Sequence, residues 1–515
     1  MLGKRDRQLS FADADNWQAK IPKESFWYQL NAWADAHLKD EDFAHLFSER
    51  MGRPSINPTR MVRAILIQLE KGLSDRELEE ASWFDDRVKY ALGTGRSPDR
   101  PVDHASLCRY RKRFLEDDTA RELLRKTLQQ AVAAKLFEGA GTDLVDSFLV
   151  AGVGARQDTY TLIRKAMARL LRLAQEEGIN IELERGDYFT KGKPRINWDD
   201  PEARRELLAS LVRDARRAVE RVGNEPSASG ELKEAAKLLQ LVAEQDIEEK
   251  DGRIDIKQGT ARDRIISVTD PEMRHGHKTA SAKVDGYKAN LMVGGKGCAL
   301  VTSIAVTPAN RPDKAVLGEL LERRCADTGL QVERLIGDSA YGDAETRLKL
   351  PEGITLVAKV PPASNSSGHF PKEAFEINLE EGWIGCPAGQ RIKMERKRKD
   401  APGWGIFTFP AERCLACGLR SRCTDARGGR TIRIHPHEEL LQEARARQKT
   451  PEFIEEYRGR SVVERVIAHL TRHGARKSRY IGNLKTEFQL TMRAVAHNIK
   501  TIARLVKAQA ATASA

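Results

Sequence analysis

The sequence predicts a mixed α/β fold with helical segments at both ends of the chain. Apolar residues recur at helical spacing within 1–135 and again within 436–507. Between these segments lie apolar runs of strand length, such as 143–150 and 332–338, and a helical stretch at 312–328. The 515 residues are 40% hydrophobic and 31% charged, which is typical of a globular protein rather than a disordered one.

Residues 1–135 are expected to form a helical N-terminal domain. Residues 61–70 carry apolar side chains at helical spacing, and Gly72 follows as a typical helix end. Ser74 and Glu77 have the spacing of a capping box that opens the next helix. A short helix at 107–115 then carries four basic residues, Arg109, Arg111, Lys112 and Arg113. This pattern is typical of a helix-turn-helix DNA-binding domain and equally of a small helical bundle, so both interpretations stay open.

Two segments, 136–155 and 256–360, are expected to form the sheet of the core. Their strand-like runs are 143–150, 264–269, 286–293, 299–307, 332–338 and 354–360. A helical insertion, 156–255, separates the two segments, with helices expected at 160–177, 200–222 and 232–248. Its apolar seam is predicted to contain Leu207, Leu208, Leu211, Leu238, Leu239, Leu241 and Val242.

The last third of the chain is expected to contain two further parts. Residues 361–435 are rich in Gly, Pro, Arg and Cys and are typical of an irregular β-type insertion. Residues 436–507 are expected to be the C-terminal helices of the core, and 508–515 a disordered tail.

Positive charge is concentrated in this last third. The chain has a formal net charge of +12 and a pI near 9.3. Residues 458–507 hold twelve basic and two acidic residues, and residues 386–433 hold twelve basic and four acidic. Two adjacent basic segments favour a polyanionic partner over a merely solvated surface. The chain shows neither an apolar run long enough for a bilayer nor an apolar leader, so a cytoplasmic protein without membrane contact is expected.

Asp146 and Asp338 are the strongest candidates for catalytic, metal-binding carboxylates. Each lies within or at the end of an apolar strand, where a carboxylate loses hydration unless it is paired or bound to a cation. Two such strands side by side would bring both acids to one sheet edge, a site that suits magnesium. Two metal ions there can activate an attacking oxygen and stabilise a leaving one in phosphodiester chemistry. The alternative for each acid is a turn residue or a helix cap.

Glu464 is the expected third ligand. Tyr457, Arg460 and Glu464 fall at i, i+3 and i+7 of one predicted helix, which places them on one face. Arg460 would then lie near a DNA phosphate. The alternative is an ordinary Arg–Glu pair at i, i+4 on a helix surface, and the spacing does not decide between the two.

These motifs together resemble the DDE-type insertion-sequence transposases of bacteria over nearly the whole chain. The similar segments are Gly52-Arg-Pro-Ser-Ile-Asn-Pro, Gly72-Leu-Ser-Asp-Arg-Glu-Leu, Asp103-His-Ala-Ser-Leu-Cys-Arg-Tyr-Arg-Lys-Arg-Phe, Ser267-Val-Thr-Asp-Pro-Glu-Met-Arg and Ile336-Gly-Asp-Ser-Ala-Tyr-Gly. Asp146, Asp338 and Glu464 match the three acids of the family. A Tyr-x2-Arg-x3-Glu-x6-Lys signature also fits, except that Thr471 stands at the Lys position, with Arg472 and His473 beside it.

The resemblance implies an RNase H-like core in which the three acids bind two Mg²⁺ (or Mn²⁺) ions. Water would cut a phosphodiester at the transposon end, and the freed 3′-hydroxyl would attack target DNA. The N-terminal domain would recognise terminal inverted repeats, and a homodimer would hold two ends on the nucleoid. The basic residues after Glu464 would follow the DNA backbone: Arg472, Arg476, Lys477, Arg479 and Lys485. Two alternatives remain, an inactive or domesticated DNA-binding derivative and a structure-specific nuclease of the same fold.

Four of the seven cysteines fall within 38 residues, at Cys386, Cys414, Cys417 and Cys423. Four thiolates can close a tetrahedral structural zinc site, and the C-x2-C spacing of the middle pair is typical of one. The alternative is a reduced cluster without metal. Transposases of this group resemble the chain here too. A disulfide framework is not expected from an odd number of cysteines in a long chain without a leader.

Overall fold

The computed structural model describes residues 2, 16–48, 54–96, 100–137, 141–277, 282–294, 297–362, 368–394 and 405–513. The chain divides into two compact units. The first contains the residues up to 139, 146–330 and those from 463 onward; the second contains 140–145 and 331–462. Helices and a mixed sheet are both present, which confirms the predicted α/β class. None of the helices in the described ranges combines the length and apolarity needed to cross a bilayer.

Helices make up the N-terminal part of the first unit. They are η2 (Trp17–Lys20), α1 (Phe26–His37), η3 (Asp40–Leu46), α2 (Pro58–Lys71), α3 (Asp75–Phe84), α4 (Asp86–Leu92), α5 (His104–Glu116) and α6 (Thr119–Ala133). The predicted caps are present. Gly72 ends α2 with φ 71°, and Ser74 and Glu77 form a reciprocal capping box at the start of α3. The predicted motif residues Gly52 and Arg53 lie outside the described residues.

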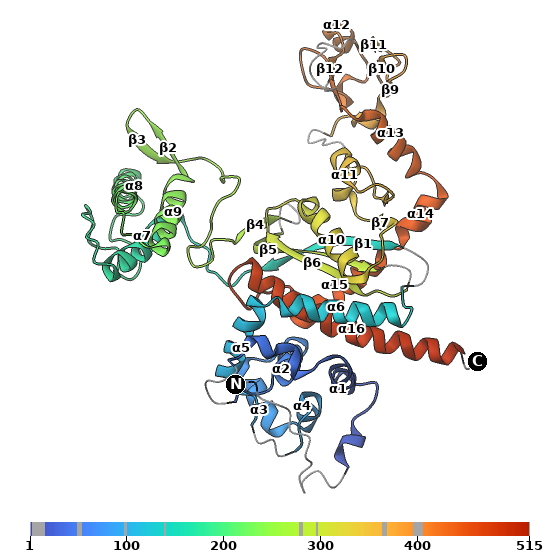
Figure 1. Ribbon diagram of the computed structural model, residues 1–515. Helices are drawn as coiled ribbons and strands as arrows, with labels where there is room; N and C mark the ends of the chain where they lie inside the picture. Colours follow the sequence, from blue (N-terminus) through green and yellow to red (C-terminus); the bar gives the residue numbers. More distant parts are fainter. Residues whose placement is uncertain are drawn as a thin grey trace. The chain divides into compact units, whose positions relative to one another are not determined.

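The longest helix, α16 (Asn483–Ala513), is central to the first unit. It packs against α2, α6 and β6, and Figure 1 shows it running beside α6. Its side chains are buried over most of 486–502. Where the sequence predicted a disordered tail from residue 508, the structure continues the helix to Ala513 with exposed side chains. Alanine has the highest helix propensity of the residues, which accounts for this extension.

A six-stranded mixed sheet forms the core. Its strands are β1 (Thr142–Ala151), β4 (Arg274–His277), β5 (Lys283–Gly294), β6 (Val301–Pro308), β7 (Arg334–Ile336) and β8 (Thr355–Val357). The order is β4-β5-β1-β7-β8, and β6 also pairs with β5. Strands β4, β5 and β6 pair antiparallel, whereas β1, β7 and β8 pair parallel. Helix α10 (Leu317–Thr328), preceded by η4 (Asp313–Val316), connects β6 to β7.

Residues 264–269 do not form the predicted strand. Ile265, Ile266 and Val268 are buried, as the apolar pattern predicted, but the backbone bonds to side chains instead of to a neighbouring strand. Gln245 exchanges two hydrogen bonds with the backbone of Ile265, and the amide oxygen of Gln157 accepts the N–H of Val268. These two glutamines satisfy the polar groups that a sheet would otherwise pair.

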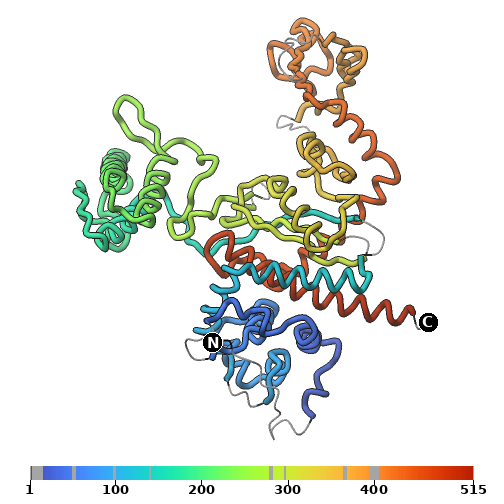
Figure 2. The backbone as a smooth tube through the Cα atoms, viewed as in Figure 1, coloured from blue at the N-terminus to red at the C-terminus, as the bar shows by residue number. Residues whose placement is uncertain are grey.

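The helical insertion folds around an apolar cluster of its own. Figure 2 shows the chain leaving after β1, passing through α7 (Thr159–Glu176), α8 (Pro201–Gly223) and α9 (Gly230–Glu244), and returning at β4. The third helix ends earlier than predicted, because a hairpin of β2 (Ile247–Lys250) and β3 (Arg253–Ile256) follows. Asp251 and Gly252 make its turn with φ 52° and 73°, the Asp-Gly signal typical of a two-residue hairpin.

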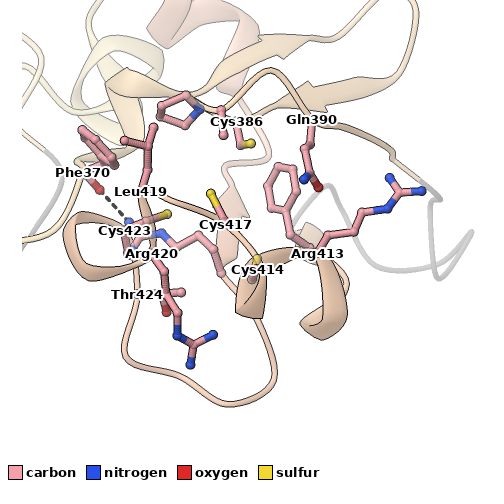
Figure 3. Close-up of a pocket in the computed structure, with 14 residues that line it drawn as sticks. Phe370, Cys386, Gln390, Arg413, Cys414, Cys417, Leu419, Arg420, Cys423 and Thr424 are labelled. Atoms are coloured by element: carbon pink, nitrogen blue, oxygen red, sulfur yellow. Dashed lines mark hydrogen bonds between the residues drawn. The ribbon is translucent and has the colours of Figure 1, made fainter.

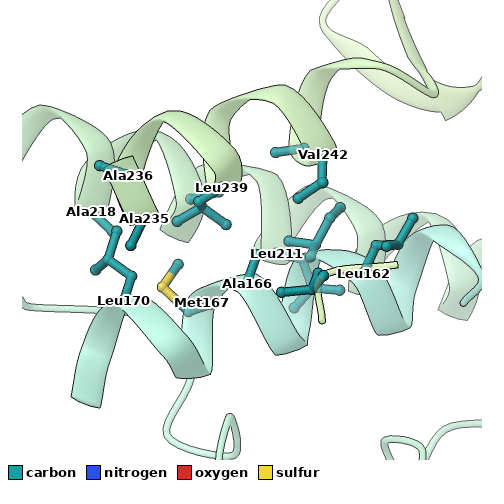
Figure 4. Packing of buried hydrophobic residues seen from close by; sticks show 14 of the residues in the cluster. Leu162, Ala166, Met167, Leu170, Leu211, Ala218, Ala235, Ala236, Leu239 and Val242 are labelled. Atoms are coloured by element: carbon teal, nitrogen blue, oxygen red, sulfur yellow. The ribbon is translucent and has the colours of Figure 1, made fainter. Parts of the chain in front are cut away.

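The predicted seam of the insertion is confirmed with one exception. Leu207, Leu208, Leu211, Leu239 and Val242 lie in the buried cluster, and Leu238 packs against it. Figure 4 shows Leu211 and Val242 pointing into the space that the helices share. Leu241 is 58% exposed, so its assignment to the seam was wrong. It lies one residue before Val242 and two after Leu239, so it falls on another face of the helix.

This packing predicts a difference between two leucines of the insertion. Leu211→Ala should destabilise the α7–α9 region by about 2–5 kcal/mol, because it removes a fully buried side chain and leaves a cavity. Leu241→Ala should change the stability by no more than about 0.5 kcal/mol. Hydrogen exchange of α7–α9 peptides in the full chain measures both effects. Equal loss of protection in the two variants would contradict the assigned packing.

The second unit contains the cysteine-rich insertion and two helices. Its small sheets join β9 (Glu376–Asn378), β10 (Trp383–Gly385) and β11 (Arg391–Lys393), and separately β12 (Gly405–Thr408) and β13 (Thr431–Ile434). Short helical turns are η6 (Lys372–Ala374), α12 (Ala411–Leu415) and η7 (Arg420–Arg422). Phe375, Ile384, Phe409, Ile432 and Ile434 form its apolar core. Helices α13 (Glu438–Arg447) and α14 (Pro451–Arg458) follow.

Candidate active site

Asp146 lies in the middle of β1, among apolar neighbours. Leu144 and Val145 are fully buried, and Asp146 itself is only 9% exposed. Its Oδ1 accepts the N–H of Ser147 at 2.8 Å. A carboxylate this far from solvent needs polar or cationic partners to stay ionised. A hard divalent cation is one such partner, and this burial is therefore consistent with a metal ligand.

Asp338 follows β7 and caps a short helical turn, η5 (Ser339–Tyr341). Its Oδ1 accepts the N–H of Ala340 at 2.8 Å, and the side chain is half-buried. Asp338 therefore does cap a helical turn, as one of the two interpretations of the sequence predicted. A carboxylate has about four lone-pair sites, so one such bond leaves capacity for further donors or a cation.

The two glycines that flank this acid are required by close packing. A side chain at Gly337 would meet the ring of the buried Tyr341 at 3.0 Å and Val145 of β1 at 3.1 Å. A side chain at Gly342 would lie 1.9 Å from the carbonyl oxygen of Lys359, which no small shift relieves. The Gly-Asp-Ser-Ala-Tyr-Gly motif therefore holds Asp338 in a turn that lies close to both β1 and the segment after β8.

The strand register relates the two aspartates. Strand β1 pairs parallel with β7, and Leu144 is opposite Ile336 at the end of the paired region. Asp146 and Asp338 each lie two residues beyond that pair in their own segments. Asp146 belongs to the first unit and Asp338 to the second.

Glu464 is exposed on α15 (Ser461–Leu470) of the first unit. The buried side of this helix contains Val463, Val466, Ile467 and Leu470.

The prediction that Tyr457, Arg460 and Glu464 share one continuous helix was wrong. Helix α14 ends at Arg458, and α15 begins at Ser461. The N–H groups of Gly459 and Arg460 bond to carbonyls three residues back, which interrupts the i→i+4 ladder. Tyr457 instead stacks on Phe453 at 5.6 Å, with Lys359 Nζ 4.9 Å from its ring centre. Arg460 lies in the turn between the two helices and is half-buried.

The residues after Glu464 form an irregular turn, η8 (Thr471–Ala475). Gly474 has φ 88°, a conformation that favours glycine. The hydroxyl of Thr471 donates to the carbonyl of Ala468 in the preceding helix. His473 Nδ1 lies 3.0 Å from the carbonyl oxygen of Glu70, whereas Arg472 is exposed. Of the two residues suggested to replace the missing lysine, Arg472 is therefore the one that faces solvent.

Helix α5 and the segment after Glu464 both contact Asp75. Arg111 donates from both terminal nitrogens to the Asp75 carboxylate, and Arg479 Nη2 lies 4.0 Å from the same group. These arginines hold the pKa of Asp75 below its ordinary value against the opposing effect of burial. Arg479 also donates to the carbonyl of Leu73, and Arg111 lies over the ring of Tyr480. Sequence reasoning missed Asp75, because nothing links it to partners so far along the chain.

This contact assigns different roles to the predicted DNA-binding residues. Arg111 is only 13% exposed, so its ion pair is part of the fold and the prediction of DNA contact is not supported for it. Arg113 lies over Phe47, with its guanidinium 4.7 Å from the ring centre. Five other basic side chains are exposed: Arg109, Lys112, Arg476, Lys477 and Lys485. The segment after Glu464 also joins the end of β1, where Ala151 bonds to the backbone of Arg476 and Ser478.

The four clustered cysteines line one pocket of the second unit. Figure 3 shows Cys386, Cys414, Cys417 and Cys423 around a shared space beside Phe370 and Arg420. Burial raises the pKa of the Cys423 thiol; Arg430 opposes this and the other three thiols add to it. Four neighbouring thiols are the donor set of a structural zinc site. In the part of the chain that the structure describes, however, no group of three or more His, Cys, Asp or Glu side chains is arranged to hold a metal ion.

Two family models match the chain. Residues 15–113 match the transposase domain (DUF772), and residues 385–503 match the transposase DDE domain. The first match ends within α5, and the second spans the four cysteines and Glu464. Comparison with curated proteins and comparison with solved structures each gave no match. With the α/β core and helical N-terminal region, these matches support a DDE-type insertion-sequence transposase, a class of enzymes that act on DNA with divalent metal ions.

Proposed function

We propose that this transposase cuts DNA at the ends of its element and joins the freed ends to target DNA, with Asp146, Asp338 and Glu464 as ligands of two Mg²⁺ ions. The strand register carries this proposal. Strand β1 pairs parallel with β7 up to Leu144 and Ile336, and each aspartate lies two residues further along its own segment. The match to a transposase DDE domain over 385–503 supports the third ligand, Glu464.

The reaction has two displacement steps at phosphorus. In the first, a water oxygen forms a bond to the phosphorus at the element's end, and the bond to the 3′-oxygen breaks to leave a 3′-hydroxyl. In the second, this 3′-hydroxyl forms a bond to a target phosphorus and a target 3′-oxygen leaves. Bound divalent cations supply activation of the attacking oxygen and stabilisation of the leaving one. The three carboxylates would hold those cations, and the hydrogen bonds from the N–H groups of Ser147 and Ala340 orient one oxygen of each aspartate.

Arg472 takes the part of the absent lysine in this proposal. It follows α15 directly and is exposed, whereas Thr471 bonds within its helix and His473 bonds to α2. A guanidinium offers two parallel donors to a phosphate, which suits a contact with the DNA backbone. Arg460, in the turn before α15, is proposed to contact a neighbouring phosphate.

The N-terminal helices are proposed to recognise the terminal inverted repeats, and two copies of the chain to hold two ends. The support is the set of exposed basic residues on α5 and within 476–485, two segments whose Arg111 and Arg479 contact the same carboxylate, Asp75. Contacts of Lys and Arg with phosphates supply affinity and position, while base contacts supply sequence preference. The cysteine pocket is proposed to hold one structural Zn²⁺ that stabilises the insertion.

Cleavage of DNA carrying the element's own ends tests the proposal. The wild-type chain should cut at the ends in Mg²⁺ or Mn²⁺ and not in EDTA, and should transfer the 3′ ends to a second DNA. Specific binding without cutting in either metal would contradict the proposed chemistry and favour a binding-only derivative. Cutting at junctions of unrelated sequence would favour a structure-specific nuclease instead.

Lys112 is predicted to contact a phosphate. Lys112→Ala should reduce the slope of log Kd against log salt by about 0.9, because one fewer counterion is released on binding. Lys237→Ala is the matched control, since both lysines are exposed on helices, at 77% and 68%, beside an acidic residue. Gel shifts with end DNA at several salt concentrations measure the slope. An unchanged slope for Lys112→Ala, or an equal change in the control, would remove α5 from the interface.

A further inference from the structure

A cluster of mostly buried titratable side chains joins α2, α15 with its following turn, and α16 within the first unit. We call it the Glu70 cluster; its members are Glu70, His469, His473, Arg493, His497 and Lys500. The mechanism proposed above uses none of them. Glu70 is only 6% exposed, and His497 only 8%.

The contacts form a continuous chain that joins helices α2, α15 and α16 to Ala299, which lies just before β6. Lys500 Nζ donates to Glu70 Oε1 at 2.5 Å and lies 3.2 Å from His469 Nε2. His469 Nδ1 lies 3.2 Å from His497 Nδ1, and His497 Nε2 lies 2.9 Å from the carbonyl oxygen of Ala299. Arg493 donates to the carbonyls of Leu69 and His473, which ties the end of α2 to the turn after α15.

These partners allow one assignment of protons. The carbonyl of Ala299 only accepts, so His497 carries its proton on Nε2 and accepts on Nδ1. His469 then donates from Nδ1 and accepts on Nε2, where the Lys500 ammonium donates. From Lys500 through His469 and His497 to Ala299, each group therefore donates to the next one, and both histidines are neutral. Such directional bonds define one arrangement, whereas an apolar contact tolerates sliding.

The electrostatics agree with neutral histidines. Burial, together with the nearby Lys500, His473 and Arg472, lowers the pKa of His469 to about 4, and Glu70 opposes this shift. Burial, with His469, Lys500 and Arg504, likewise lowers the pKa of His497 to about 4, and the Ala299 carbonyl opposes this shift. Burial and Lys71 also lower the pKa of Lys500, and Glu70 raises it.

The position of this series of hydrogen bonds in the fold suggests its structural role. Helix α15 has only ten residues, with a turn at Gly459 and Arg460 before it and the irregular η8 after it. Its buried face is apolar. Glu464 is on this helix, five residues before His469, so any rotation or shift of α15 displaces both together.

We infer that Glu70, Lys500 and His469 are positioning residues that hold α15, and with it Glu464, in place against α2 of the N-terminal domain. The inference rests on the proposed metal-binding role of Glu464. It adds that the domain proposed to bind transposon ends is physically linked, through one hydrogen-bonded chain, to the helix that carries the third acid. Outer partners of metal ligands typically change metal affinity by about 10–100-fold when they are removed.

Two variants of the cluster test this. Lys500→Met removes the central donor, and Glu70→Gln/Lys500→Met removes both charges, so that no buried carboxylate is left unpaired. Lys126→Met is the matched control: Lys126 is 23% exposed and Lys500 21%, and each lysine bonds to a carboxylate of the N-terminal helices. The readouts are Mn²⁺ affinity by titration calorimetry, the Mg²⁺ concentration for half-maximal end cleavage, and end binding in EDTA.

Both cluster variants should weaken Mn²⁺ binding and raise the half-maximal Mg²⁺ concentration by about tenfold or more, with end binding changed by less than about twofold. Lys500→Arg should restore much of the affinity because it keeps a donor to Glu70. Wild-type metal dependence in both cluster variants, or loss of end binding with unchanged metal affinity, would overturn the inference. Glu464→Gln in the same assays distinguishes failure of this inference from failure of the proposed function. If Glu464→Gln keeps wild-type metal affinity and cleavage, the proposed function itself fails.

Discussion

Asp338→Asn should reduce metal-dependent cleavage of end DNA by at least about a thousandfold while leaving DNA binding unchanged. Metal ions commonly supply several kcal/mol of transition-state stabilisation, and each 1.4 kcal/mol is about a factor of ten in rate. An amide is a poor substitute for a carboxylate at a divalent cation. It still accepts the hydrogen bond from Ala340, so the cap of η5 survives the substitution. Single-turnover cleavage in saturating Mg²⁺ measures the effect.

Asp343→Asn is the matched control for this experiment. Asp343 lies five residues further on and caps α11 (Ala344–Lys349) by accepting the N–H of Thr346. Asparagine and aspartate are nearly equal as helix caps, so this variant should cut at the wild-type rate. Asp146→Asn should behave like Asp338→Asn. Wild-type cleavage by Asp338→Asn would remove this acid from the site and leave it only the capping role.

Cys414→Ser should abolish zinc binding, from about one Zn²⁺ per chain in the wild type to none. A tetrahedral thiolate site loses a quarter of its ligands, and metal binding in such sites is coupled to folding, so the insertion should also lose order. Metal analysis of protein purified without chelators measures the content. Hydrogen exchange of the 368–394 and 405–434 peptides measures the order of the insertion.

Cys325→Ser serves as the control for the zinc experiment, since Cys325 lies on α10 outside the pocket. It should keep about one Zn²⁺ per chain. A wild-type chain that carries no zinc, or a Cys414→Ser chain that keeps a full equivalent, would show that the four thiols are a metal-free packing cluster.

Local patterns allowed accurate predictions where short-range chemistry decides the structure. The capping box at Ser74 and Glu77 and the helix end at Gly72 depend on hydrogen bonds within a few residues, and both are present. The strands that carry Asp146 and precede Asp338 were likewise predictable, because buried strands are rich in apolar residues. The family was also recognisable from its motifs, and the two transposase matches support it.

Predictions failed where distant residues decide. A helical period extends equally well through Gly459, and only the backbone bonds show that α14 and α15 are separate. The contacts of the Arg111 guanidinium with Asp75 and Gln68 were also not predictable from the sequence, because these partners lie 36 and 43 residues away. Residues 264–269 have the composition of a strand, but the side chains of Gln157 and Gln245 bond to their backbone.

The three acids and the four cysteines could be singled out from the sequence as predicted metal ligands, from their residue types, their spacing and the family resemblance. Which basic side chains remain exposed, and how α15 is held, became visible only in the tertiary structure. Those properties depend on partners from elements far apart in the chain, such as Glu70 with Lys500 and Asp75 with Arg479. Sequence spacing describes neighbours along a helix or strand, whereas burial and ion pairing depend on which elements pack together.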